Sequence, residues 1–163
     1  MSNLPPRGLK FEKIPETFRM ATKAVWVIDN DLDEEVIVQK VWEQLAMPYE
    51  LRYFQDADSF MEALADEEVS PFIIICDYNL GVPSGLELRR QMLSKHEQKY
   101  ESVPFIFWSN SAGDRQITAA YDVKAHGFFV KDPTLSQLKE TFADIIRYWS
   151  KSKMPPKNVN GNQ

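Results

Sequence analysis

The chain has 163 residues and a formal net charge of −5, which favours one domain and argues against bulk attraction to nucleic acid or an anionic membrane. Hydrophobic residues make up 44% of the sequence, enough to build a buried core. The single cysteine, Cys76, cannot form an intramolecular disulfide, and we expect no membrane span and no signal peptide. These features predict a cytoplasmic location.

Three parts are expected along the chain. Residues 1–22 contain several prolines and show no clean periodicity, so they are interpreted as an N-terminal extension. Residues 23–150 are predicted to form the folded domain. Residues 151–163 are rich in lysine, proline and asparagine and are interpreted as a C-terminal tail.

Within the folded part, strands and helices are predicted to alternate. Four near-continuous apolar runs indicate strands buried on both faces, and one run with alternating charged residues indicates a half-exposed edge strand. Positions spaced by three and four residues indicate helices between them. In chain order, the expected elements are strand 25–28, helix 38–45, edge strand 49–53, helix 59–64, strand 72–76, helix 84–95, strand 105–108, helix 114–124, strand 128–130 and helix 135–149.

This alternation predicts an α/β fold, a flavodoxin-like (βα)5 doubly wound parallel sheet with strand order 2-1-3-4-5. The order places the weakly apolar strand 49–53 at an edge and keeps every crossover right-handed. Strands 25–28 and 72–76 are then neighbours at the point where the strand order reverses. In open α/β sheets, ligands bind in the crevice at that point.

Each of the four apolar strands is followed by one polar or reactive residue, namely Asp29, Asp77, Ser109 or Lys131. Taken singly, these residues have ordinary explanations: Asp29 and Ser109 suit helix caps or turns, and a lone lysine is usually solvated. The carboxyl ends of parallel strands share one edge, however, so the four side chains are expected to meet. Two carboxylates, a hydroxyl and an ammonium suit phosphoryl chemistry with a bound Mg²⁺.

In this order, these residues resemble the receiver domain of bacterial two-component response regulators over about residues 22–150. The matching motifs are the acidic turn after the first strand, Asp77 with Gly85 downstream, Ser109, and an aromatic-x-x-Lys pattern in the fifth strand. The end of the last helix, residues 147–150, looks like that of single-domain receivers that partner phytochrome-type histidine kinases.

The resemblance implies that Asp77 accepts a phosphoryl group from a sensor histidine kinase. It implies that Lys131 pairs with the phosphate, that Ser109 moves to hydrogen-bond it, and that Phe128 turns inward. The implied Mg²⁺ ligands are Asp29, Asn30, Asp77 and the backbone carbonyl of Asn79.

The same resemblance implies a signalling domain with only its own phosphorylation and dephosphorylation chemistry. The signal would leave through the surface of the fourth helix, fifth strand and fifth helix, toward a downstream protein or a second copy of the chain. Neither nucleic acid nor membrane is an expected partner.

Three departures from the family pattern keep alternatives open. Asn30 replaces the second acidic residue, Gly81 replaces a proline, and Asp132 separates Lys131 from Pro133. The loss of charge at Asn30 favours, as one alternative, a receiver-like binding module that works without phosphorylation. The other alternative is a haloacid-dehalogenase-like phosphatase.

In the phosphatase alternative, Asp29 would be the nucleophile and Asp31 the general acid of a D-x-D motif. The residues after that motif, Leu32 and Asp33, depart from the small or hydroxyl residues expected there. Asp77 would have no role. These points favour the interpretation as a receiver domain.

Overall fold

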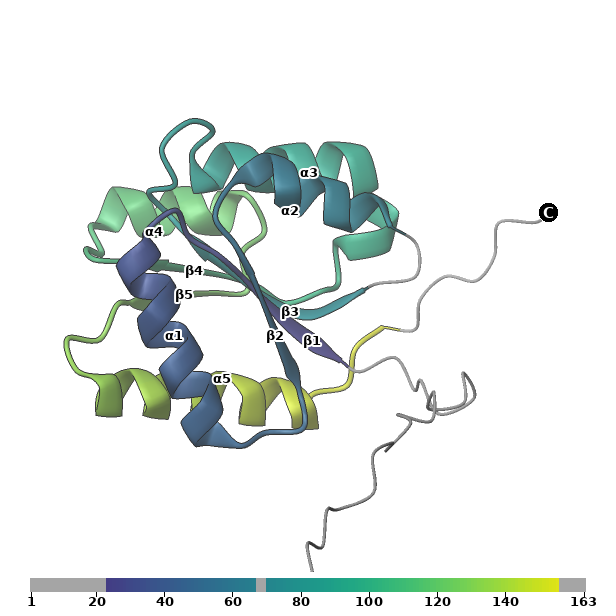
Figure 1. Ribbon diagram of the computed structural model, residues 1–163. Coiled ribbons are helices and arrows are strands. Elements are labelled where there is room, and N and C mark those ends of the chain that lie inside the picture. Colours follow the sequence, from purple (N-terminus) through teal and green to yellow (C-terminus); the bar gives the residue numbers. More distant parts are fainter. Residues whose placement is uncertain (1–22, 67–69, 156–163) are drawn as a thin grey trace, which may run out of the picture.

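A computed structural model describes residues 23–66 and 70–155, so the expected N-terminal extension and most of the expected tail lie outside the described residues. The described residues contain a parallel sheet with the order β2-β1-β3-β4-β5 (Figure 1), which confirms the predicted fold. The strands are β1 (Ala24–Ile28), β2 (Glu50–Phe54), β3 (Pro71–Asp77), β4 (Phe105–Ser109) and β5 (Gly127–Val130).

Helices cover both faces of the sheet (Figure 1). They are α1 (Leu32–Leu45), α2 (Ala57–Ala65), α3 (Gly85–Tyr100), α4 (Asp114–Asp122) and α5 (Leu135–Lys151). Side chains of α2, α3 and α4 share one buried cluster with one face of the sheet, and side chains of α1 and α5 share a second cluster with the other face. None of the helices in the described ranges is both long and apolar enough to cross a membrane.

Alternate residues of β1 face the two buried layers. Trp26 and Ile28 join the cluster under α2 and α3, whereas Val25 and Val27 join the cluster under α1 and α5. All four side chains have no exposed surface. Apolar residues at consecutive positions are therefore required, because both faces of the strand are buried.

Helix α3 differs from the prediction, because it runs to Tyr100 rather than ending near residue 95. The backbone leaves helical geometry at His96, with φ of −139° and ψ of 27°. Tyr100 beyond it is fully buried and its hydroxyl donates a hydrogen bond of 2.6 Å to the carbonyl of Leu64. Burial of this aromatic ring holds a final turn that the helical pattern alone does not predict.

The loop between β3 and α3 folds tightly over the end of the sheet. Position 85 requires a glycine, because a Cβ there would lie 2.4 Å from the carbonyl oxygen of Asp77. Gly81 has a φ of +100°, in the region that favours glycine. The Val82–Pro83 peptide bond in this loop is cis.

Candidate functional site

Asp29 and Asp77 lie side by side at the carboxyl edge of the sheet. They follow and end the neighbouring strands β1 and β3, where Ile28 pairs with Cys76. Asp29 has no exposed surface and Asp77 is 6% exposed. Two carboxylates so close and so poorly hydrated require a compensating positive charge.

Lys131 supplies positive charge to both carboxylates. Its ammonium nitrogen lies 2.7 Å from an oxygen of Asp29 and 3.4 Å from an oxygen of Asp77. Its backbone N–H donates to the carbonyl of Ser109, which fixes the chain just after β5. The ammonium also lies 4.7 Å from the centre of the Trp108 ring. Lys131 is therefore an integral part of the site and not a solvated surface lysine.

The electrostatics of this group are set first by burial. Burial raises the pKa of Asp29 from 3.8 to about 6, and the neighbouring charge of Asp77 adds to the rise. Lys131 and the backbone N–H of Asp31 oppose it. Burial alone would lower the pKa of Lys131, but its contacts with Asp29 and Asp77 raise that pKa, so the lysine stays charged.

Ser109 and Asn79 complete the wall of the site around Asp77. Ser109 is fully buried, and its hydroxyl oxygen accepts hydrogen bonds from the side chain of Asn79 at 3.3 Å and from the backbone N–H of Ser111 at 3.4 Å. The backbone N–H of Asn79 donates to the other carboxylate oxygen of Asp77 at 2.9 Å. Asp77 is thus oriented from two sides, by a backbone amide and by an ammonium.

Asn30 and Phe128 both lie next to residues that follow Asp77. The amide nitrogen of Asn30 donates to the carbonyl of Leu80 at 2.9 Å, which ties the loop after β1 to the loop after β3. Phe128 is partly buried and lies 5.8 Å, ring centre to ring centre, from Tyr78, the residue after Asp77. The four residues that follow the apolar strands are brought together as predicted, and these two residues flank them.

Comparison with known proteins identifies the family of this chain. Residues 25–143 match the family model of the response regulator receiver domain. The chain belongs to this family. Receiver domains act in two-component signalling. The match to the family model confirms the resemblance seen in the sequence.

Two curated relatives are similar to this chain over different lengths. A probable methanogenesis regulatory protein, FilR2 of Methanothrix harundinacea, is 19% identical over 129 residues, covering 77% of this chain and 82% of that protein. A chemotaxis protein CheY homolog of Campylobacter jejuni is 30% identical over 74 residues, covering 45% of this chain and 55% of the relative.

Among solved structures, the phosphorylated cyanobacterial phytochrome response regulator RcpA is similar with a TM-score of 0.71 and 22% identity, covering 83% of this chain and 99% of that one. The Mn²⁺-bound form of response regulator Rcp1 is similar with a TM-score of 0.68 and 19% identity, covering 82% and 99%. These likenesses support the fold of the receiver.

Receiver domains typically bind Mg²⁺ or Mn²⁺ in an acidic pocket, and the donor set here fits such an ion. Within the described ranges, no three His, Cys, Asp or Glu side chains are grouped closely enough to hold a metal by themselves. Mg²⁺ is commonly held by one or two carboxylates together with waters and phosphate oxygens. Asp29 and Asp77 would supply the carboxylates, with Asn30 and the carbonyl of Asn79 as the predicted neutral ligands.

Sequence reasoning missed three contributors to the receiver site. Glu34 reaches to 3.9 Å from the Lys131 ammonium, Trp108 lies against that ammonium, and Tyr53 donates to the carbonyl of Asp31 at 3.2 Å. The position of Glu34 in the first turn after Asp29 was the available signal. The other two come from side-chain directions that a single sequence does not reveal.

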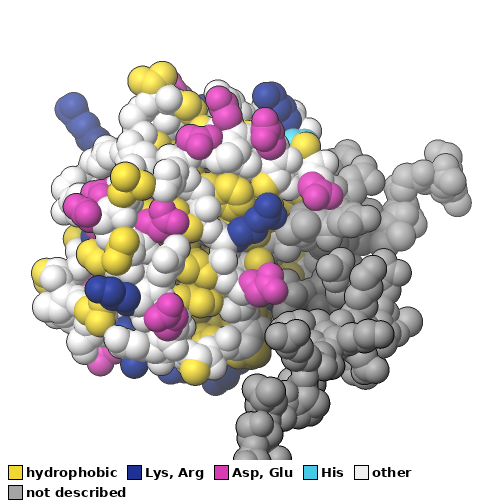
Figure 2. Space-filling view, in the orientation of Figure 1, with side chains coloured by type: hydrophobic (Ala, Val, Ile, Leu, Met, Phe, Trp, Pro, Cys, Tyr) yellow, Lys and Arg dark blue, Asp and Glu magenta, His cyan; other side chains and the backbone are white. Residues whose placement is uncertain are grey.

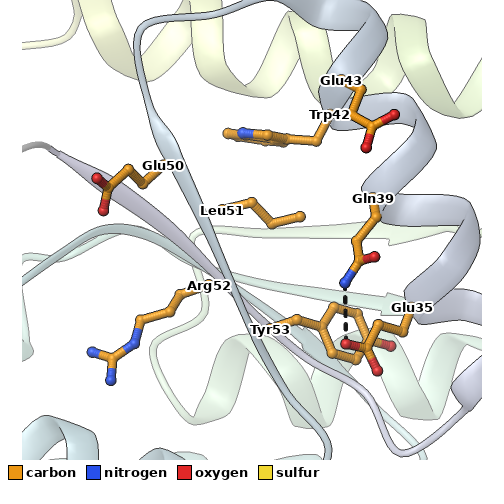
Figure 3. Close-up of a pocket in the computed structure, with 8 residues that line it drawn as sticks. All are labelled: Glu35, Gln39, Trp42, Glu43, Glu50, Leu51, Arg52 and Tyr53. Carbon is orange, nitrogen blue, oxygen red and sulfur yellow. Dashed lines mark hydrogen bonds between the residues drawn. The ribbon is translucent and has the colours of Figure 1, made fainter. Parts of the chain in front are cut away.

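A groove beside the site has Tyr53 in common with it. It has a volume of about 590 Å³ and lies between α1 and the edge strand β2, as Figure 3 shows. Its walls include Trp42, Leu51 and Tyr53, and Gln39 donates to Glu35 along the helix. The residues that do not line it include Asp29, Asp77, Ser109 and Lys131. On the face drawn in Figure 2, acidic, basic and hydrophobic side chains are interspersed.

Proposed function

We propose that this receiver accepts a phosphoryl group on Asp77 from a sensor histidine kinase, in a Mg²⁺-dependent reaction, and thereby switches a protein-interaction surface. The observation that carries the proposal is the position of Asp77 at the end of a buried strand, between the backbone N–H of Asn79 and the ammonium of Lys131. A carboxylate oriented in this way and placed beside a cation is suited to act as a nucleophile toward phosphorus.

In the proposed reaction, a carboxylate oxygen of Asp77 forms a bond to the phosphorus of a phosphohistidine. The phosphorus–nitrogen bond breaks, and the imidazole leaves with the electron pair and takes up a proton. Lys131 pairs with the negative oxygens of the transferred group, and Asn79 holds the other Asp77 oxygen in place. Mg²⁺, when bound, neutralises charge on the phosphoryl oxygens and on Asp29.

The switch would run from Ser109 and Phe128 to the surface of α4, β5 and α5. A hydrogen bond from Ser109 to a phosphate oxygen would draw this residue away from Asn79, its present partner. Phe128, packed near Tyr78, would then turn inward. Such a switch is a shift between two arrangements, with a free energy of a few kcal/mol at most.

The α4–β5–α5 surface has the apolar character that a partner needs. Tyr121, Phe129, Val130 and Tyr148 are exposed on it by 38% to 65%. Phe129 and Tyr148 also border a hollow of about 450 Å³ with Trp149 at its wall. We propose that a downstream protein or a second copy of the chain binds there, and that this takes place in the cytoplasm.

The dehalogenase-like alternative is disfavoured by Asp31. Its carboxylate accepts hydrogen bonds from the backbone N–H groups of Asp33 and Glu34 and so caps α1. The alternative also gives no role to Asp77, which shares Lys131 with Asp29. The binding module without phosphorylation is the second candidate, favoured by the neutral side chain of Asn30 at a family acidic position.

The test is incubation of the full chain with acetyl phosphate and Mg²⁺, followed by intact mass measurement. The wild type should gain one phosphoryl mass, Asp77→Asn should gain none, and Asp33→Asn, at an exposed position nearby, should behave as the wild type. Labelling of Asp77→Asn but not of Asp29→Asn would establish the dehalogenase-like mechanism. A wild type that gains no mass would favour the module that works without phosphorylation.

A further inference from the structure

A third carboxylate faces the Lys131 ammonium from helix α1. An oxygen of Glu34 lies 3.9 Å from the ammonium nitrogen, and the Glu34 side chain is only 21% exposed. The cap formed by Asp31 sets the start of the helix and therefore the direction of its first turn. Glu34 is thus placed at the site by local structure, on an element that carries none of the four strand-end residues.

The net charge of the site indicates what the acidic side chain of Glu34 contributes. Asp29, Asp77 and Glu34 carry three formal negative charges around the single positive charge of Lys131, which leaves a net charge of −2. Asn30 contributes no charge, although the family pattern has an acidic residue there. With Glu34 included, the site has the charge that balances one divalent cation.

Glu34 also provides an alternative partner for Lys131. The ammonium is now closest to Asp29, at 2.7 Å, so a divalent cation that binds Asp29 would repel it. Glu34 and Asp77 are the other carboxylates within 4.0 Å of the ammonium in the described residues. An acceptor on the helix side lets the lysine leave Asp29 while it stays beside Asp77.

We propose that Glu34 is a positioning residue of the phosphoryl site, which replaces the charge missing at Asn30 and retains Lys131 beside Asp77 when a divalent cation is bound. The proposal rests on the proposed function, since it concerns the same site. It assigns Glu34 a role in metal affinity that can be measured on the unphosphorylated chain.

The experiment is a calorimetric titration of the full chain with Mg²⁺ at pH 7.5 and low salt, on the wild type, Glu34→Gln, Asp33→Asn, Asn30→Asp and the double variant Asn30→Asp with Glu34→Gln. Glu34→Gln should weaken binding by roughly threefold to tenfold, as expected for one charge near a divalent ion at the protein surface. Asp33→Asn removes the same charge from the same helix turn, at an exposed position, and should change binding by less than about twofold.

The double variant separates charge from structure. Asn30→Asp should tighten binding in the wild type by about tenfold. In the Glu34→Gln background, it should restore an affinity close to that of the wild type, because the net charge is then restored. Urea unfolding of each variant, with a midpoint close to that of the wild type, shows that the fold is intact.

Each outcome decides the proposal. Unchanged affinity in Glu34→Gln, an equal loss in Asp33→Asn, or no restoration by Asn30→Asp would overturn it. A wild type that binds Mg²⁺ but takes no phosphoryl group, with Glu34→Gln weakened, would overturn the proposed function and leave the role of Glu34 in place. A wild type without Mg²⁺ affinity would overturn both.

Discussion

Replacing Asp29 with Asn should change how the stability of the domain depends on pH. Asp29 has no exposed surface, and burial raises its pKa from 3.8 to about 6. Below pH 3.8, the carboxyl is protonated in both the folded and the unfolded chain. Between pH 3.8 and about 6, the folded chain keeps a proton that the unfolded chain has released, so stability falls as pH rises.

The size of this effect follows from the two pKa values. One pKa unit corresponds to about 1.4 kcal/mol, so ionised Asp29 lowers the free energy of unfolding by about 3 kcal/mol above pH 6. Asparagine has a single side-chain oxygen, which can still accept from the backbone N–H of Asp31, but its NH2 group replaces the oxygen that now accepts from Lys131. Asp29→Asn should therefore lose the pH-dependent fall in stability, while loss of the hydrogen bond from Lys131 lowers its stability across the whole pH range.

The assay is urea unfolding without divalent cations at pH values from 3.5 to 8, compared between wild type and Asp29→Asn. The wild type should lose stability relative to the variant by about 3 kcal/mol between pH 3.8 and 6, with no further difference above. Asp122→Asn, at an exposed position of α4, should follow the wild type. Parallel profiles for wild type and Asp29→Asn, or a relative gain of the wild type with rising pH, would refute the reasoning.

Three other predictions follow from contacts in and around the site. Gly85→Ala should destabilise the fold by about 1 to 3 kcal/mol in urea unfolding and slow the labelling of Asp77, since the new methyl group meets a backbone carbonyl at 2.4 Å. Arg89→Met should destabilise by about 1 to 3 kcal/mol, because the buried guanidinium donates to two carbonyls that follow α4. In hydrogen exchange, beryllofluoride should change protection from Ser109 through α4 and from β5 to Lys131, and Lys131→Ala should blunt the change.

Matched variants are available for the two substitutions, and each of the three predictions has a result that would contradict it. Gly113→Ala should be tolerated, because its Cβ would meet only ordinary contacts, and Arg90→Met should be nearly neutral at its exposed position. Equal effects of the two glycine variants would contradict the steric argument. Equal effects of the two arginine variants would contradict the role of the buried guanidinium. Exchange changes confined to the loop after Asp77 would contradict the output surface.

The sequence predicts the sheet well because burial on both faces leaves a strong pattern. The strands that begin with Val25 and Phe72 in the prediction begin one residue earlier in the structure, and the alternating segment around Leu51 is indeed an edge strand. The meeting of Asp29 and Asp77 follows from strand order alone. These features depend on backbone topology, which apolar runs and crossover rules constrain strongly.

Other features depend on single side chains that contact distant elements. The last turn of α3 exists because Tyr100 is buried and bonded to Leu64. Arg89 looks like a surface residue of a charged helix, yet it is fully buried and lies 4.6 Å from the ring centre of Phe105. Glu34 looks like one of several acids in the first turn of a helix. Their partners lie far away in sequence, so no local period indicates them.

The central claim is tested most directly by locating the phosphoryl group. After reaction with acetyl phosphate and Mg²⁺, borohydride reduction converts an aspartyl phosphate to homoserine, and peptide mass spectrometry identifies the altered position. Our account predicts homoserine at position 77 and unmodified aspartate at position 29. Homoserine at position 29, with Asp77 intact, would contradict it.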